Sequence, residues 1–210
     1  MNNKWITIII LFLCSILSVI AYFYWDIPLT IYCKGLGRSV LDIAEIVTIW
    51  GESRWYYMIL VPAFIYFWFL AKNKLWSKRI LFILISLSVS GLINMLVKWI
   101  AGRHRPINFF TNGFFGFDHF HTVYELTSFP SGHAVTAFSL AVAVSILFPR
   151  TSITAFIIAI SIGMTRIILT SHYLSDVIAG AGIGILSTMI VKYFFDRKKI
   201  ELVHKREGIK

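Results

Sequence analysis

Long apolar runs separated by short polar segments dominate the pattern of this chain. The first run covers residues 5–25 and reads WITIIILFLCSILSVIAYFYW. A transmembrane α-helix needs about 20 mostly apolar residues, which this run supplies. The same pattern predicts five further membrane spans at residues 55–71, 80–100, 131–148, 152–169 and 172–195. We therefore expect an all-α polytopic membrane protein with six transmembrane helices.

A signal peptide is the alternative interpretation of the first run. Its apolar region would be shorter and would end in a cleavage site of small residues. The run instead continues into Tyr22, Phe23, Tyr24 and Trp25, an aromatic group typical of a membrane interface. We expect the run to be retained as the first span.

The segment between the first two spans, residues 26–53, is less hydrophobic. Within it, SVLDIAEIVTIW has helical spacing but is too short and too charged to cross a bilayer. It predicts a short amphipathic helix at the membrane interface. In the second span, Pro62 predicts a kink. The remaining connections are a basic connector at 72–79, a long loop at 101–130, a tight turn at 149–151 and a basic tail at 196–210.

Composition agrees with a membrane protein. Of the 210 residues, 58% are hydrophobic and 14% are charged, and the mean hydropathy is +0.76. A soluble domain is nearer a quarter charged, so we expect one membrane domain over residues 1–210. Cys14 and Cys33 lack metal-ligand spacing, and Cys14 lies in an apolar run, so we assign them neither a disulfide nor a function.

The net charge of +10 follows the predicted topology. Six spans place both termini on one side, together with the 72–79 connector and Arg150. That side carries 13 of the 20 Lys and Arg residues but only three of the ten acidic residues. Because basic residues concentrate in cytoplasmic segments, we expect the termini in the cytoplasm. The charge is thereby explained by topology, and no nucleic-acid partner is expected.

Ionisable residues stand beside hydrocarbon in the stretch 166–176, RIILTSHYLSD. Such residues are costly in a bilayer and tend to be functional. His172 and Asp176 are four apart, so on a helix they share a face and the carboxylate can orient the imidazole. Arg166 would point elsewhere on one continuous helix. We therefore expect a break near residues 170–171, with His172 opening the last span.

A second group of cations follows the third span. Lys98 and Arg105 are seven apart and share a face if the helix continues that far, although Pro106 predicts a stop. The alternative is a pair of snorkelling side chains at a helix end. By the predicted topology these cations lie on the outer side, where positive charge is disfavoured. This position favours an anionic ligand. Arg103 and His104 are secondary candidates for contact with a headgroup.

The long loop ends in Pro130-Ser131-Gly132-His133, followed by a helix of small residues. Ser131 is expected to be the N-cap. The free amides of Gly132, His133 and Ala134 would then form an anion site, which the helix dipole strengthens. The alternative is a simple capped helix with an interfacial histidine.

The predicted topology brings these three groups to one leaflet. Three cations and aligned amides suit the oxygens of a phosphoryl group. The two histidines suit a nucleophile and a general acid, because imidazole performs either task near neutral pH.

The three segments also carry a family resemblance. K-x6-R-P from Lys98 to Pro106, P-S-G-H from Pro130 to His133 and R-x5-H-x3-D from Arg166 to Asp176 resemble, in order and spacing, the signature motifs of the type 2 phosphatidic acid phosphatase family. The expected six-span architecture extends the resemblance to nearly the whole chain. Thr165 is a departure, since the family often has serine there, but it keeps a hydroxyl.

The resemblance implies a metal-independent phosphatase without a cofactor. His172 would attack phosphorus and form a phosphohistidine, Asp176 would hold the ring of His172, and His133 would protonate the leaving oxygen. The residues implied in phosphate binding are Lys98, Arg105, Arg166, Ser131 and Gly132.

Other residues allow competing interpretations. Asp118, His119 and His121 could suggest a metal site, but D-H-F-H lacks a convincing geometry and the family needs no metal. The loop's aromatic residues could form a mouth for a lipid chain or simply pack over the bundle; they are Phe109, Phe110, Phe114, Phe115, Phe117, Phe120 and Phe129. Gly180 and Gly184 predict close helix packing.

We therefore expect a phosphatase in a bacterial cytoplasmic (inner) membrane, with its site facing the periplasm or the cell exterior. Its partners would be membrane lipids and a phosphorylated lipid substrate: undecaprenyl diphosphate, phosphatidylglycerol phosphate, phosphatidic acid or a lipid A phosphate. The motifs are expected to recognise the phosphate group, and they identify neither the lipid that carries it nor the oligomeric state. A lipid phosphotransferase and a non-catalytic lipid-phosphate binding or transport protein are the alternatives.

Overall fold

The computed structural model describes residues 3–202, and in that range it contains helices and no β-strand. The predicted basic tail therefore lies partly outside the described residues, from position 203 onward. The helices are α1 Asn3–Tyr24, α2 Asp26–Lys34, α3 Arg38–Thr48, α4 Ser53–Ile65, α5 Lys74–Ala101, α6 Pro106–Asn112, α7 Gly132–Leu147, α8 Ser152–Ile168 and α9 Leu174–Arg197.

Within residues 3–202, four segments are long and apolar enough to cross a membrane: Trp5–Tyr24, Lys74–Ala101, Pro149–Ile168 and Leu174–Arg197. The all-α class and four of the expected spans are thus confirmed. With 16 residues, α7 is shorter than these spans. The 13-residue α4 continues as a π-helical turn, Tyr66–Leu70, that begins one turn after Pro62. The six-span count and the kink stay predictions.

Two boundaries differ from the sequence prediction. The basic connector at 72–79 is wrong over most of its length, because α5 begins at Lys74, where the Asn73 side chain accepts a hydrogen bond from the amide of Trp76. At the other end, α5 stops at Gly102, whose φ is +57°. A Cβ at Gly102 would lie 1.5 Å from the carbonyl oxygen of Asp118, so only glycine fits this stop.

The expected amphipathic helix is present as α3, while its place at the membrane interface stays a prediction, and two short helices were not expected. In α2, Pro28 stands in the first turn, where its missing N–H costs nothing. In α6, Pro106 is the first helical residue, so the proline that was expected to end one helix begins another.

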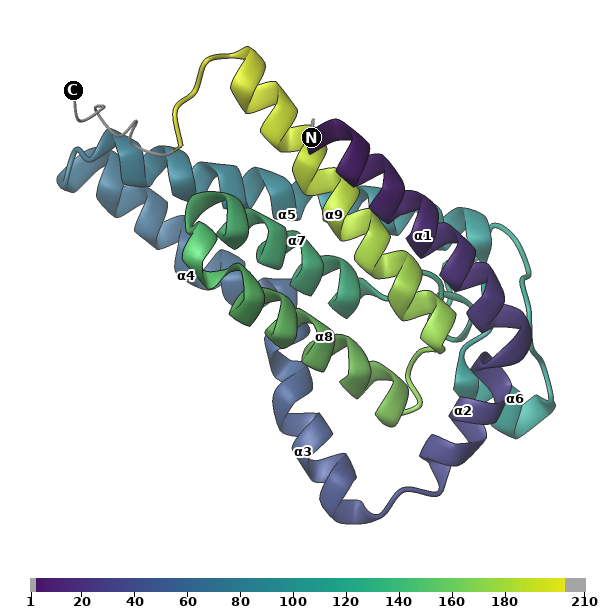
Figure 1. Ribbon diagram of the computed structural model, residues 1–210. Coiled ribbons are helices and arrows are strands. Elements are labelled where there is room, and N and C mark those ends of the chain that lie inside the picture. The colour runs from purple at the N-terminus through teal and green to yellow at the C-terminus, as the bar shows by residue number, and fades with distance from the viewer. Residues whose placement is uncertain (1–2, 203–210) are drawn as a thin grey trace.

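The bundle is built around α7 and α9, with α5, α8 and α1 packed around this pair (Figure 1). A Cβ on Gly180 would lie 2.7 Å from the carbonyl oxygen of Ser131, and one on Gly184 would lie 2.6 Å from that of Val135. The close packing predicted for these glycines is therefore confirmed. Inside the contact, the hydroxyls of Ser139 and Thr188 are 2.8 Å apart.

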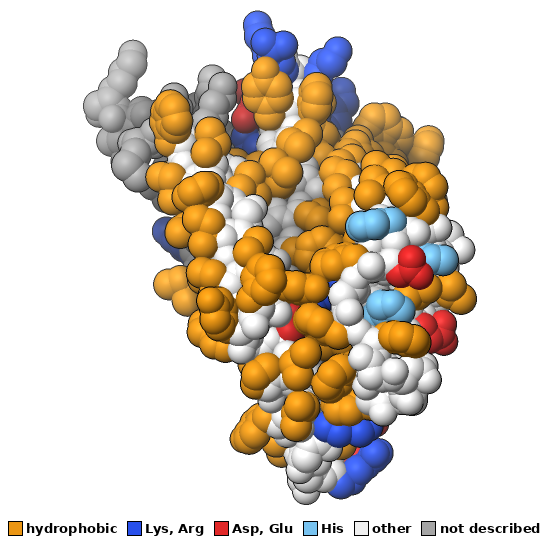
Figure 2. Space-filling view, turned by 90° about the vertical axis from the view of Figure 1, so that its right-hand side faces the viewer, with side chains coloured by type: hydrophobic (Ala, Val, Ile, Leu, Met, Phe, Trp, Pro, Cys, Tyr) orange, Lys and Arg blue, Asp and Glu red, His pale blue; other side chains and the backbone are white. Residues whose placement is uncertain are grey.

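Different helix ends and turns gather at the two ends of the bundle. The start of α1, the end of α9 and the α7–α8 turn lie at one end, whereas the start of α9 and the ends of α5 and α8 lie at the other (Figure 1). In Figure 2, hydrophobic side chains cover much of the face, Lys and Arg stand mostly at its top and bottom, and His, Asp and Glu side chains gather on its right side.

Candidate active site

His172 lies in the turn that joins α8 to α9. The turn is tight, because the amides of Ser171 and His172 both donate to the carbonyl of Arg166, at 3.0 and 3.1 Å, and Thr170 has a φ of +47°. The predicted break at residues 170–171 is confirmed. The prediction that His172 opens the last helix is wrong by two residues, because α9 begins at Leu174 with Tyr173 as its N-cap.

The two nitrogens of the His172 ring face opposite charges. Nδ1 lies 3.6 Å from Oδ2 of Asp176, and Nε2 lies 3.4 Å from Nη1 of Arg105. A guanidinium can only donate, so this contact requires Nε2 to be the unprotonated acceptor and places the ring proton on Nδ1, toward the carboxylate. This is the tautomer that a nucleophilic Nε2 requires.

Burial keeps His172 neutral. Its side chain is 3% exposed, and burial lowers its pKa to about 3, with Asp176 opposing the shift and Arg105 and Lys98 adding to it. At neutral pH the ring therefore carries a free lone pair on Nε2.

Asp176 is held from several sides. Its Oδ2 accepts from the amide of Tyr173 at 2.9 Å and from the hydroxyl of Ser128 at 2.6 Å. Its Oδ1 accepts from Nη1 of Arg103 at 2.5 Å. The carboxylate is fully buried, and its position beside His172 is fixed by donors from the turn before α9 and from both ends of the long loop.

Lys98 and Arg105 converge although they do not share a helix. Nζ of Lys98 and Nη2 of Arg105 both donate to the carbonyl oxygen of Thr127, at 2.5 and 3.2 Å. Arg105 also donates to the carbonyls of Tyr124 at 2.8 Å and Ser171 at 2.9 Å. The helix does not continue to Arg105, since α5 ends at Ala101, so the two cations share no helical face and the long loop brings them together instead.

Arg166 approaches from the end of α8. Its Nη1 donates to the Thr48 hydroxyl of α3 at 2.8 Å, while its buried Nε has no hydrogen-bond partner among the described residues. Arg166, Arg105 and Lys98 all lie close enough to His133 to act on its charge. The three expected cations therefore surround one site.

Ser131 precedes α7 as its N-cap residue, as predicted, but its side chain does not cap the helix. The buried Oγ of Ser131 has no partner within residues 3–202. Its amide donates to the carbonyl of Asp176 at 3.0 Å, which ties the start of α7 to α9. The first amides of α7 after Ser131 have no acceptor within the helix, so the hydroxyl and these amides offer donors to an anion.

His133 and Gly132 line a cavity of about 450 Å³ between α4, α5 and α7. Glu52, Arg54 and Asn94 also line it. A Cβ on Gly51 would lie 2.4 Å from Cδ2 of His133, so glycine at this position allows the segment before α4 to pack on the imidazole.

Arg103 does not have the role predicted for it. It is fully buried and forms ion pairs with Asp26 and Asp176, so the expected contact with a headgroup is wrong. Asp26 and Ser128 were missed altogether. For Asp26, a signal existed in the sequence, because a carboxylate directly after an apolar span is as unusual as those in the stretch 166–176.

The remaining loop residues form other contacts. His104 lies 3.1 Å from the side-chain amide nitrogen of Asn108, His121 lies 3.0 Å from the carboxylate of Asp118, and His119 lies 3.0 Å from the carbonyl of Ile100. Among the described residues there is no group of three His, Cys, Asp or Glu side chains that could hold a metal ion.

Some aromatic residues of the long loop pack against the bundle, and others are exposed. Phe115 stacks on Tyr22 and meets Tyr173 edge to face, whereas Phe114 and Phe120 are 57% and 62% exposed. Packing over the bundle end is therefore real for part of the loop, and a mouth for a lipid chain stays a prediction.

The fold and the site define a helical membrane protein in which three cations lie near His133 and two of them near His172, beside a free hydroxyl and a helix N-terminus. The family model of the PAP2 superfamily matches residues 79–200. The chain belongs to this superfamily, and the resemblance carried by its three motifs is confirmed.

Similar proteins include the lipid A 1-phosphatase of Rhizobium etli, which is 35% identical over 70% of this chain and 67% of its own length. The bacitracin transport permease protein BcrC of Bacillus licheniformis is 24% identical over 83% of this chain and 81% of its own length. Among solved structures, a PAP2 type phosphatidylglycerolphosphate phosphatase from Bacillus subtilis has a TM-score of 0.65 at 21% identity, over 93% of this chain and 97% of that chain. LpxE of Aquifex aeolicus has a TM-score of 0.59 at 20% identity, over 80% and 94%.

Proposed function

We propose that this protein is a lipid phosphatase that removes phosphate from a lipid headgroup through a phosphohistidine intermediate. The observation that carries the proposal is the His172 ring, with Nδ1 toward Asp176 and Nε2 toward Arg105. Membership of the PAP2 superfamily and the lipid A 1-phosphatases among its relatives support the substrate class.

In the first step, Nε2 of His172 bonds to phosphorus as the bond between phosphorus and the leaving oxygen breaks. The protonated ring of His133 gives its proton to that oxygen. Burial and the charges of Arg166, Arg105 and Lys98 favour the neutral form of His133, and the negative charge of the bound phosphate favours the protonated form. Because charge spreads over the equatorial oxygens, the three cations stabilise the transition state.

In the second step, water attacks the phosphohistidine. His133 now accepts the proton of that water, and the bond between phosphorus and Nε2 breaks to release inorganic phosphate. The unpartnered hydroxyl of Ser131 and the Gly132 amide hold the phosphoryl oxygens through both steps.

Two cavities on either side of α4 suit the two parts of a lipid. The cavity at Gly132 and His133 has a polar lining that includes the unpartnered Oδ1 of Asn94, which can accept a hydrogen bond from a headgroup hydroxyl. We place the headgroup there, because His133 would meet the leaving oxygen on that side.

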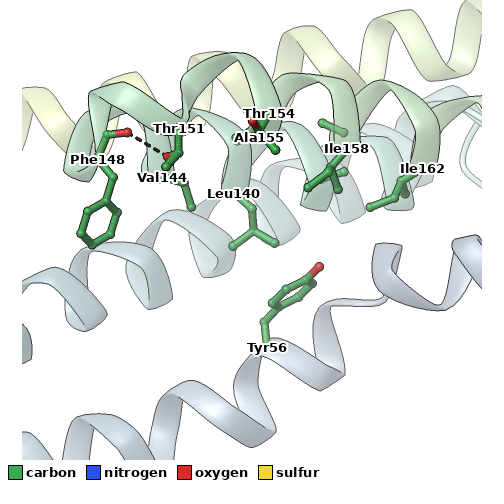
Figure 3. A pocket seen from close by; sticks show the side chains of 12 residues that line it. Tyr56, Leu140, Val144, Phe148, Thr151, Thr154, Ala155, Ile158 and Ile162 are labelled. Atoms are coloured by element: carbon green, nitrogen blue, oxygen red, sulfur yellow. Dashed lines mark hydrogen bonds between the residues drawn. The ribbon is translucent and has the colours of Figure 1, made fainter.

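The second cavity has a volume of about 400 Å³ and lies between α4, α7 and α8. Figure 3 shows Tyr56 on one side, opposite Leu140, Ile158 and Ile162. Its lining is almost wholly apolar and lies among helices expected in the bilayer, so an acyl chain of the substrate fits it by chemistry.

A lipid panel tests this function. Purified protein in detergent is assayed for phosphate release from a lipid A 1-phosphate, phosphatidic acid, phosphatidylglycerol phosphate and undecaprenyl diphosphate. We expect release from at least one lipid and a loss of about a thousandfold or more in His172→Ala. Equal release by the wild type and His172→Ala on every lipid would contradict catalysis and leave the binding or transport alternative.

A further inference from the structure

Asp26, Arg103 and Asp176 form a buried chain of charges behind the nucleophile. Nη2 of Arg103 donates to Oδ2 of Asp26 at 2.6 Å, and Nη1 donates to Oδ1 of Asp176 at 2.5 Å. All three side chains are fully buried. They come from α2, from the segment after α5 and from α9, so the chain of charges links three parts of the fold at one point.

The donors around Asp26 match an ionised carboxylate. Its Oδ1 accepts from the amide of Ser175 at 2.9 Å, and its Oδ2 accepts from the Ser175 hydroxyl at 2.5 Å as well as from Arg103. Each of these partners is a donor, as a carboxylate requires. Burial raises the pKa of Asp26, while Arg103 and Ser175 oppose that rise.

Arg103 is also enclosed by aromatic rings. Its guanidinium carbon lies 4.5 Å from the ring centre of Tyr173, 4.9 Å from that of Tyr22 and 5.5 Å from that of Phe115. These rings exclude water from the ion pairs, which strengthens the electrostatic effect of each charge.

The net charge of this network bears on the reaction at His172. One guanidinium between two carboxylates leaves a net charge of −1 beside His172. When Nε2 bonds to phosphorus while Nδ1 keeps its proton, the ring becomes a cation. Without Asp26, Arg103 would cancel the charge of Asp176, and the network would carry no net negative charge to balance that cation. An unbalanced charge in a buried site is costly.

We propose that Asp26 is a positioning residue for the phosphatase reaction: through Arg103 it fixes Asp176 and supplies the negative charge that balances the His172 cation. The inference rests on the proposed function and extends the site to α2, which lies outside the three sequence motifs. Asp26 touches neither the substrate nor His172, so it acts on the step in which the cation forms.

Asp26→Asn keeps the shape of the side chain and removes its charge. We expect kcat to fall by about tenfold or more, with KM for the lipid changed by less than about twofold, because ground-state phosphate binding uses other residues. Ser18→Ala is the matched control. It removes a buried hydrogen bond of 3.0 Å to the carbonyl of Ser175 without changing a charge, and its kcat should match that of the wild type.

Calorimetry gives a readout that needs no turnover. Orthovanadate imitates the phosphoryl group in its transition state, whereas inorganic phosphate imitates the product. We expect Asp26→Asn to bind vanadate about tenfold more weakly than the wild type and to bind phosphate within about twofold. Equal weakening of both anions, or of neither, contradicts the inference.

A double variant separates charge from packing. Asp26→Asn combined with Arg103→Gln returns the network to −1, so we expect it to bind vanadate more tightly than Asp26→Asn alone. If the network served only packing, the second substitution would weaken binding further, and that result would overturn the proposal. Failure of the proposed function is distinct, because it appears as wild-type protein that releases phosphate from no lipid.

Discussion

Single residues set the chemistry of this site through the partners of each atom. Arg105 is the clearest case: it donates to the carbonyls of Tyr124 and Ser171, and its contact with Nε2 fixes the tautomer of His172. The backbone carbonyls thus aim a cation at the place where phosphate would bind. Arg105 is itself 7% exposed, so its position is set by the fold and is ready before substrate arrives.

At the same scale, the buried neutral His172 makes stability depend on pH. Burial lowers its pKa from 6.5 to about 3, so between these values the unfolded chain binds a proton that the folded chain does not. Stability from this residue is present above about pH 6.5 and is lost as the pH falls toward 3. We expect the Tm of the wild type to fall more steeply below pH 6.5 than that of His172→Gln, measured in one detergent. Parallel curves would contradict the prediction.

The candidate site could be predicted from the sequence residue by residue, but its supports could not. The motifs identified His172, His133 and Asp176, and the structure brings His172 and Asp176 together as expected. The support by Asp26 was missed because it lies 150 positions before Asp176, and no periodic pattern connects residues so far apart. Arg103 was misassigned because sequence alone does not distinguish an exposed cation from one buried between two carboxylates.

At the scale of elements, spans were easier to predict than the segments between them. The apolar runs located α1, α5, α8 and α9, because a bilayer demands long runs of one kind. In contrast, α2 and α6 are short and are stabilised by tertiary contacts, so no local pattern revealed them. The end of α5 was also hard to predict, because it depends on the carbonyl of Asp118 packing against Gly102. These residues are 16 apart in the sequence, so no local pattern shows the contact.

The apolar cavity between α4, α7 and α8 gives a test at this scale. We expect Ile158→Trp to fill the cavity and raise KM for a long-chain lipid phosphate by about tenfold, because displacing a few methylenes from apolar contact costs about 0.8 kcal/mol each. Hydrolysis of a short-chain, water-soluble phosphate ester should not change, and steady-state kinetics on both substrates measure this.

Ile153→Trp is the matched control for this measurement. Ile153 lies on the same helix, is 78% exposed and does not line the cavity, so its variant should behave as the wild type on both substrates. An equal effect of Ile158→Trp on the long and short substrates would show that the cavity does not bind the lipid chain.

At the scale of the whole molecule, the arrangement of charge predicts which way the bundle faces. Within residues 3–202, the segments that carry the basic residues counted as cytoplasmic lie at the opposite end of the bundle from the site (Figure 1). From the positive-inside preference we therefore predict that the site lies on the outer face of the membrane, where the phosphate of an outer-leaflet lipid would reach it.

Cysteine labelling in intact cells tests this orientation. After Cys14 and Cys33 are replaced by alanine, a cysteine is introduced either at the exposed loop residue Phe120 or at the exposed Lys198 after α9. We expect a membrane-impermeant maleimide to label Phe120→Cys from outside and to label Lys198→Cys only after permeabilisation. The opposite labelling pattern would invert the topology.

The covalent step at His172 is the central claim, and trapping the intermediate tests it most directly. Wild-type protein is mixed with a lipid labelled with radioactive phosphorus, quenched in alkali within the first turnover, and digested to locate the label. We predict label on the peptide that contains His172, with the acid lability of a phosphohistidine, and none in His172→Ala. Label-free wild-type protein that still releases phosphate, or label that persists in His172→Ala, would contradict the account.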